Sequence, residues 1–163
     1  MSLVQLLIED HSFFRNRFQQ IRTLGSLSEI NKNTSLLLAL TNEFRKRHKI
    51  HLRRETELLI PSLKEAYRKQ GIKPTNPFLL FHLEEEHVSV GRNMYLLEQE
   101  LTASSISKAC VPLLQKVILS YIPHMEKEER DLFPEAERLI PLKQLEKMAH
   151  IPVSEDDELL RFC

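Results

Sequence analysis

Two short segments of the chain pair a histidine with a glutamate four residues later. His51 is followed by Glu55, and His124 is followed by Glu128. On a helix, side chains four residues apart leave the same face about one turn apart. Imidazole together with carboxylate suits iron, manganese or zinc, so two such pairs on facing helices could hold metal ions between them. In both segments a proline stands six residues after the glutamate.

Two further histidines, His11 and His87, fall on two other predicted helices. The steps along the set His11, His51, His87 and His124 are 40, 36 and 37 residues. Each step is about one helix plus one turn. Neighbouring helices of a bundle would therefore carry their histidines at a similar height.

Helical periodicity, interrupted by turn signals, defines the elements that must position these residues. It predicts helices over residues 2–24, 33–68, 77–101 and 107–140. The second helix should begin at the polar residues Asn33 to Ser35. Pro61 should bend its helix, because proline removes a helical hydrogen bond, and Pro123 and Pro134 lie inside the fourth helix.

Short connections between long helices favour an all-α fold, an antiparallel up-down-up-down four-helix bundle. Residues 142–149 could form a short helical tail, and residues 154–158 are acidic. We therefore expect a metal-binding domain over residues 1–150, followed by a mobile acidic tail over residues 151–163.

The candidate donors share their helix faces with apolar residues. On a step of about 100° per residue, Glu55 lies near 40° from His51, and Leu40 lies near −20° from it. Two buried carboxylates are costly unless a cation, a proton or hydrogen bonds neutralise them. A lone inward histidine is usually an ordinary hydrogen-bonded side chain, but six donors on matching faces favour a metal site.

Two other residues lie at the edge of the donor faces. His48 and Glu84 each fall within about 60° of a donor histidine, so they are weaker ligand candidates. We expect a packing or supporting role for His48 and a solvated charge for Glu84. His82 should face away from the bundle. Tyr121 lies about one turn before His124, where it could line an access pocket or simply pack in the core.

Composition excludes several classes of partner. Lys plus Arg and Asp plus Glu both number 23, so the formal net charge is zero, which argues against nucleic acid or an anionic membrane. No apolar stretch approaches the roughly 20 residues of a membrane span. The chain opens without the pattern of a signal peptide, and two cysteines are too few for a disulfide scaffold. We expect a cytoplasmic protein.

Four histidines and two glutamates exceed the ligands of one tetrahedral zinc. They fit two ions bridged by both carboxylates, with iron expected and manganese or zinc still open. The ferritin-like arrangement would need two Glu-x-x-His motifs, and Glu84 with His87 supplies one.

With these residues the chain resembles the hemerythrin-like family, also called the HHE cation-binding domain. The resemblance spans about residues 3–150 and is carried by four pieces: Glu9 to His11, His51 to Glu55 with Pro61, Glu86 with His87, and His124 to Glu128 with Pro134. It implies a four-helix bundle around a non-haem, oxo- or hydroxo-bridged di-iron centre. By this resemblance the terminal ligands would be His11, His51, His87 and His124, and the bridges would be Glu55 and Glu128.

The sequence departs from the oxygen-carrying members of that family at two positions. Those members have a second histidine four residues before the ligand of the third helix, where this chain has Leu83. Their last carboxylate is an aspartate five residues after the histidine of the fourth helix. Here Glu128 stands four residues after it and Glu129 five. The missing imidazole leaves a coordination position open to water, hydroxide or an exogenous ligand. Reversible oxygen carriage is therefore less expected than a redox, nitric oxide or iron-handling role.

Three functions follow. The first is a di-iron protein that binds or responds to a small diatomic ligand, O₂ or NO, or to iron or redox state. The second is an oxygen- or peroxide-consuming enzyme or an iron donor. The third is a metal-free helical interaction domain. We favour a non-enzymatic role and leave turnover open. The cysteine-bearing leader of the iron–sulfur repair members is not found in this sequence, which weighs against that role.

Overall fold

The structure is a computed structural model, and it describes residues 1–24, 30–101 and 110–153. The helices are α1 (Leu3–Leu24), α2 (Ile30–Arg53), α3 (Ile60–Gln70), α4 (Leu79–Leu101), α5 (Cys110–Lys127), α6 (Phe133–Leu139) and α7 (Leu142–Ala149). Two π-helical segments, Arg54–Leu59 and Glu128–Leu132, connect α2 to α3 and α5 to α6 without a break.

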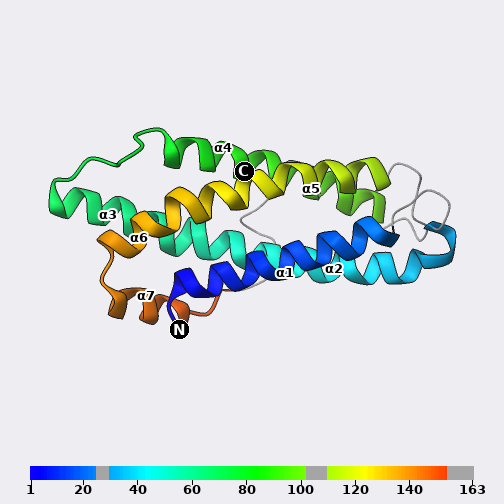
Figure 1. The fold of residues 1–163 in the computed structure, drawn as a ribbon, viewed down its shortest axis with the longest axis horizontal. Coiled ribbons are helices and arrows are strands. Elements are labelled where there is room, and N and C mark those ends of the chain that lie inside the picture. The colour runs from blue at the N-terminus through cyan, green and yellow to red at the C-terminus, as the bar shows by residue number, and fades with distance from the viewer. Residues whose placement is uncertain (25–29, 102–109, 154–163) are drawn as a thin grey trace.

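The predicted all-α bundle is confirmed. In Figure 1, α1 lies alongside α2, and α4 lies alongside α5, with these rods along the long axis of the molecule. The short helix α7 lies beside the N-terminal end of α1, which it contacts. It occupies residues 142–149, as predicted for the helical tail.

The second helix begins earlier than predicted. Ile30 is already helical, so the polar residues expected to cap the helix at Asn33 lie within it. A capping preference is worth only about 1 kcal/mol, which is small against the cooperative extension of a helix. Residues 107–109 of the predicted fourth helix and the acidic residues 154–158 lie outside the described residues.

Pro61 and Pro134, which follow the two glutamates, are accommodated by π-helical turns, whereas Pro123 lies inside α5. The backbone N–H of Ile60 donates to the carbonyl of Glu55, and that of Phe133 donates to the carbonyl of Glu128, both across five residues. In an α-helix the ring of Pro61 or Pro134 would meet the carbonyl four residues earlier. The wider turn relieves that conflict, and such π-turns often occur at functional sites.

The apolar core is divided in two. One cluster, which includes Leu7, Leu63 and Leu132, lies toward α7, and the other, which includes Phe14 and Phe44, lies toward the opposite end. The histidines and glutamates predicted as donors lie between the two clusters. None of the described helices combines the length and apolarity that crossing a membrane requires.

Candidate metal centre

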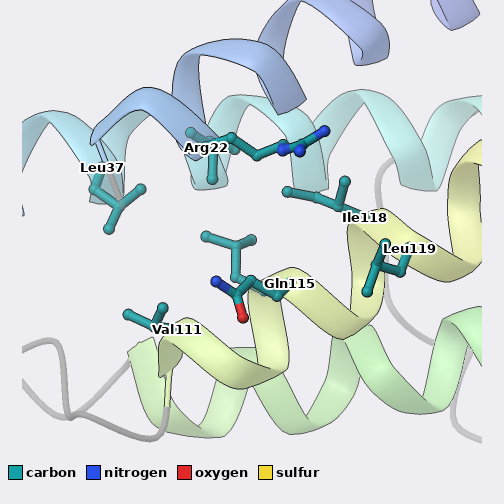
Figure 2. A pocket seen from close by; sticks show the side chains of 8 residues that line it. Arg22, Leu37, Val111, Gln115, Ile118 and Leu119 are labelled. Atoms are coloured by element: carbon teal, nitrogen blue, oxygen red, sulfur yellow. The ribbon is translucent and has the colours of Figure 1, made fainter. Parts of the chain in front are cut away.

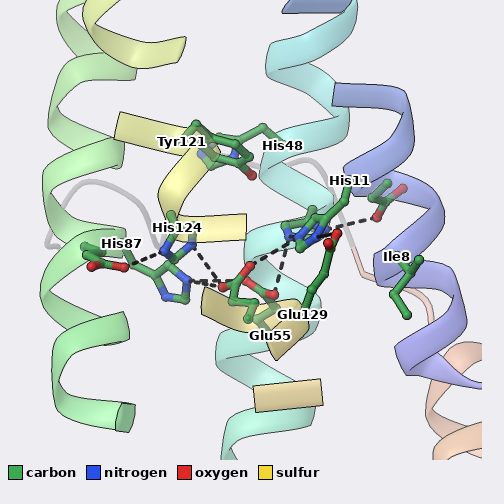
Figure 3. A network of polar contacts seen from close by, with 12 residues as sticks. Ile8, His11, His48, Glu55, His87, Tyr121, His124 and Glu129 are labelled. Atoms are coloured by element: carbon green, nitrogen blue, oxygen red, sulfur yellow. Dashed lines mark hydrogen bonds and ion pairs between the residues drawn. The ribbon is translucent and has the colours of Figure 1, made fainter. Parts of the chain in front are cut away.

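The six predicted donors come together in the middle of the bundle as two overlapping groups. The first group is His11, His51, Glu55 and Glu128, and the second is Glu55, His87, His124 and Glu128. In each group the ligand atoms all lie within 4.8 Å of one another. Figure 3 shows His87 and His124 on one side of Glu55 and His11 on the other. The two glutamates belong to both groups, which is the arrangement that a pair of bridged ions needs.

The bundle has four long rods: α1, α2 with α3, α4, and α5 with α6. Each rod contributes to this cluster from its inward face. His11 comes from α1, His51 from α2, His87 from α4 and His124 from α5. Both glutamates stand in the π-helical segments. All six side chains are buried, and His87 is the most exposed of them at 7%.

Each glutamate directs its oxygens toward both histidine pairs. In Glu55, Oε1 lies 3.4 Å from Nε2 of His51, and Oε2 lies 3.3 Å from Nε2 of His87. In Glu128, Oε2 lies 3.2 Å from Nε2 of His11, and Oε1 lies 3.0 Å from Nε2 of His124. An ion placed in either group would therefore face two imidazole nitrogens and one oxygen of each carboxylate.

Three of the imidazoles form hydrogen bonds with carboxylates through Nδ1, the ring nitrogen that faces away from the cluster. Nδ1 of His11 lies 2.8 Å from Glu129, Nδ1 of His51 lies 3.3 Å from Asp10, and Nδ1 of His124 lies 2.9 Å from Glu86. An ionised carboxylate only accepts hydrogen bonds, so each of these Nδ1 atoms carries a proton. Such a partner orients a metal-binding imidazole and makes its free nitrogen a better ligand.

Sequence reasoning did not assign this orienting role to Asp10, Glu86 or Glu129. A signal was present, because each acid directly neighbours a candidate donor in the sequence. Each of them, however, orients the histidine of a different helix, and only the packing of the rods reveals that.

Basic side chains hold the orienting acids in place. Asp10 accepts a hydrogen bond from Nε of Arg47 at 2.5 Å, and Glu129 accepts two at 2.8 Å from Arg15. Glu86 forms an ion pair with Lys127. The hydrogen bonds of Glu86 with His124 and Lys127, which outweigh its partial burial, lower its pKa to about 2. Glu86 therefore stays an acceptor at neutral pH.

The imidazole nitrogens and glutamate oxygens at the centre of the cluster have too few hydrogen-bond donors among them. When Nδ1 carries the proton, Nε2 of a neutral imidazole has only a lone pair to offer. The Nε2 atoms of His11 and His51 lie 3.2 Å apart, so in the neutral forms two lone pairs would face each other. Both oxygens of Glu55 and Oε2 of Glu128 are buried without a hydrogen bond. Lone pairs facing one another in a buried space require positive charge between them. The donor set therefore fits metal cations.

Without metal, protons would have to supply that charge. Burial lowers the pKa of His51, but the charge of Glu55 and the hydrogen bond with Asp10 raise it to about 10. Burial also opposes protonation of His87 and His124, but contacts with Glu128, joined by Glu55 at His87 and by Glu86 at His124, raise the pKa of each to about 9. In the metal-free protein, three protonated imidazoles would then supply the positive charge that metal ions would otherwise supply.

Aromatic rings enclose the cluster. Phe14 packs edge-on against His51 with ring centroids 5.2 Å apart, and Phe133 lies 5.3 Å from the ring of His11. The ring of Tyr121 lies 5.8 Å from that of His124. These rings surround part of the donor cluster with apolar surface.

The weaker candidates lie outside both donor groups. His48 is buried, and its Nδ1 forms a 2.9 Å hydrogen bond with the hydroxyl of Tyr121. This is a supporting contact next to the cluster. Glu84 is half exposed and pairs with Lys64 at 2.6 Å. His82 faces outward, with its side chain 55% exposed.

The two positions that depart from oxygen-carrying proteins have clear surroundings. Leu83 is fully buried in the apolar cluster that lies toward α7, and its side chain offers no donor atom. Glu128 faces the donors and Glu129 supports His11 from outside. The adjacent acids thus divide two tasks between them.

One cavity of about 230 Å³ lies away from the donors, among side chains of α1, α2 and α5 (Figure 2). It is lined by Ile21, Arg22, Leu37, Val111, Leu114, Gln115, Ile118 and Leu119. No donor of the cluster lines it, and its lining is apolar except for Arg22 and Gln115.

Comparison with known proteins agrees with the geometry. The family model described as the hemerythrin HHE cation binding domain matches residues 2–136. No curated protein and no solved structure matches the chain. The family match covers all six donors and most of the chain, so the protein belongs to the hemerythrin HHE cation-binding family.

Proposed function

We propose that the protein holds a pair of iron ions between its four long rods and binds or responds there to a small diatomic ligand. One observation carries the proposal. Glu55 and Glu128 each direct one oxygen toward each histidine pair, and three of these four oxygens have no hydrogen bond. Imidazole and carboxylate in this ratio suit iron, with manganese or zinc as the alternatives.

The ligand set supports a site that stays open to exogenous molecules. Each group offers four protein donors, two imidazoles and one oxygen from each glutamate. Non-haem iron centres of this type keep positions for further ligands. The buried Leu83 adds no fifth donor. The iron pair would supply redox chemistry and ligand binding, while the protein fixes the donors and excludes water.

The location and partners are part of the same proposal. A cytoplasmic protein of this kind would respond to O₂, NO, iron or redox state, and its balanced charge offers no basis for a nucleic-acid partner.

The direct test is optical. Protein loaded anaerobically with ferrous iron and then oxidised should gain near-ultraviolet charge-transfer absorption. Azide, dithionite or nitric oxide should each change that spectrum, because each reaches or reduces an open iron site. Protein that stays colourless and retains no iron after this treatment would contradict the proposal.

Metal binding should also release protons at neutral pH. The pKa values of His51, His87 and His124 are raised to about 10, 9 and 9, so these rings are protonated in the metal-free protein. A metal needs neutral imidazole, so loading displaces about three protons. Calorimetric titrations in buffers of different ionisation enthalpy should give different apparent enthalpies. Apparent enthalpies that do not depend on the buffer would contradict the predicted release.

The metal-free protein should lose stability as the pH rises. A raised histidine pKa stabilises the fold fully below its ordinary value of 6.5 and no longer once the pH exceeds the folded value. The melting temperature of the metal-free protein should therefore fall between about pH 6.5 and pH 10, through the folded values of about 9 and 10. The loaded protein should not show this fall.

A further inference from the structure

The two halves of the donor cluster are built alike. His87 follows His11 by 76 positions, and the same step leads from Asp10 to Glu86. A step of 73 positions leads from His51 to His124 and from Glu55 to Glu128. Corresponding residues make corresponding contacts, since Asp10 supports His51 as Glu86 supports His124.

The outer cations follow the same relation. A step of 73 positions leads from Arg54 to Lys127. Arg54 reaches Asp10 at 3.4 Å, and Lys127 pairs with Glu86. The correspondence therefore extends beyond the donors to the groups that hold them.

The correspondence does not extend to the contacts of Glu129. Glu129 supports His11 and is itself held by Arg15. The counterpart of Glu129 is Thr56, whose hydroxyl donates instead to the carbonyl of Leu52 at 2.8 Å. The counterpart of Arg15 is Gly91, which has no side chain that could hold an acid. An added Cβ at Gly91 would meet no atom within 4 Å.

His87 is left without a supporting acid as a result. Its Nδ1 is buried, and no described residue forms a hydrogen bond with it. The other three donor imidazoles each have a carboxylate at Nδ1. His87 is also the most exposed of the six donors. Removing such a carboxylate from a metal-binding histidine typically weakens metal binding by about 10- to 100-fold.

We infer that the two ions are held unequally: the group with His11 and His51 binds the first ion tightly, and the group with His87 and His124 binds an exchangeable second ion. This inference rests on the proposed metal function. The number of ions held would then follow the metal supply, with a one-ion form when metal is scarce.

The test is a titration with Co²⁺ against a coloured chelator. The natural chain should bind in two steps whose dissociation constants differ by about 10- to 100-fold. Thr56→Glu places a carboxylate where the correspondence predicts support for His87. This variant should lower the dissociation constant of the second step by about tenfold and so bring the two dissociation constants closer together. Thr56→Gln, whose amide oxygen is a weaker acceptor, should tighten it less.

The reciprocal change is Glu129→Thr. It removes the acid behind His11 and should weaken the first step by about tenfold while sparing the second. The matched control is Glu57→Thr, because Glu57 pairs with Arg53 at the surface and contacts no donor. Both constants should stay unchanged in that variant.

Two equal constants in the natural chain would overturn the inference. A folded Thr56→Glu variant whose two dissociation constants differ as much as those of the natural chain would also overturn it. If Thr56→Glu fails to fold, as judged by circular dichroism, Glu129→Thr decides, and weakening of both steps alike would count against unequal sites. A natural chain that binds no Co²⁺ at all would contradict the proposed metal function itself, which is a separate outcome.

Discussion

Replacing Glu55 with alanine should remove most of the bound metal. This side chain is fully buried, and its two oxygens face His51 and His87 at 3.4 and 3.3 Å. In the proposed centre, its loss would take one donor from each of the two ions at once. Loss of a supporting group alone costs about 10- to 100-fold in affinity, so the loss of a shared ligand should cost at least about 100-fold. Metal per chain, measured after loading and desalting, checks this.

The control for Glu55 is His82→Ala. His82 lies on the same rod as His87 but its side chain is 55% exposed, so its loss should leave the metal content unchanged. Glu55→Gln keeps the shape of the buried side chain and should lose metal as Glu55→Ala does. Equal metal retention in Glu55→Ala and His82→Ala would contradict the assignment of the donors.

Loading with metal should raise the melting temperature by about 10–20 °C. A ligand that binds only the folded state stabilises it by about 2.7 kcal/mol at 100 times its dissociation constant, so a pair of ions adds about 5 kcal/mol. In a domain of this size 1 kcal/mol shifts the melting temperature by about 2–4 °C. Differential scanning calorimetry with and without metal measures the shift.

The same experiment separates the metal centre from a metal-free interaction domain. In the metal-free alternative, protonated His51, His87 and His124 neutralise the two glutamates, and the fold needs no ion. A chelator should then leave the melting temperature unchanged. For the metal centre, a chelator should reverse the gain in the natural chain and have little effect on Glu55→Gln.

The inward faces of the rods could be predicted from the sequence because they depend on helical geometry alone. A step of about 100° per residue places Glu55 beside His51 and Glu128 beside His124. The structure brings these residues together with His11. The outward direction of His82 followed from the same count and agrees with its exposure.

The local backbone at the glutamates could not be predicted in the same way. Pro61 predicts a bend in its helix, and Pro134 lies inside the predicted fourth helix. The structure has π-helical turns, in which the glutamate carbonyls accept hydrogen bonds across five residues. The choice between a bend and a wider turn depends on the packing of the neighbouring rods, which periodicity does not describe.

The supporting contacts also depend on the packing between rods. Asp10 orients a histidine on α2, and Glu86 orients one on α5. The pairing of His48 with Tyr121 joins α2 to α5 in the same way. Their sequence positions allow many partners, and the relative rotation of the rods selects one.

Metal analysis of the natural chain, purified without a metal-affinity tag and loaded with iron, tests the central claim most directly. The buried cluster of imidazoles and carboxylates should retain about two iron ions per chain after desalting, and the Glu55→Gln chain should retain almost none. Equal iron in the two chains, or none in either, would contradict the claim that these six side chains form a metal centre.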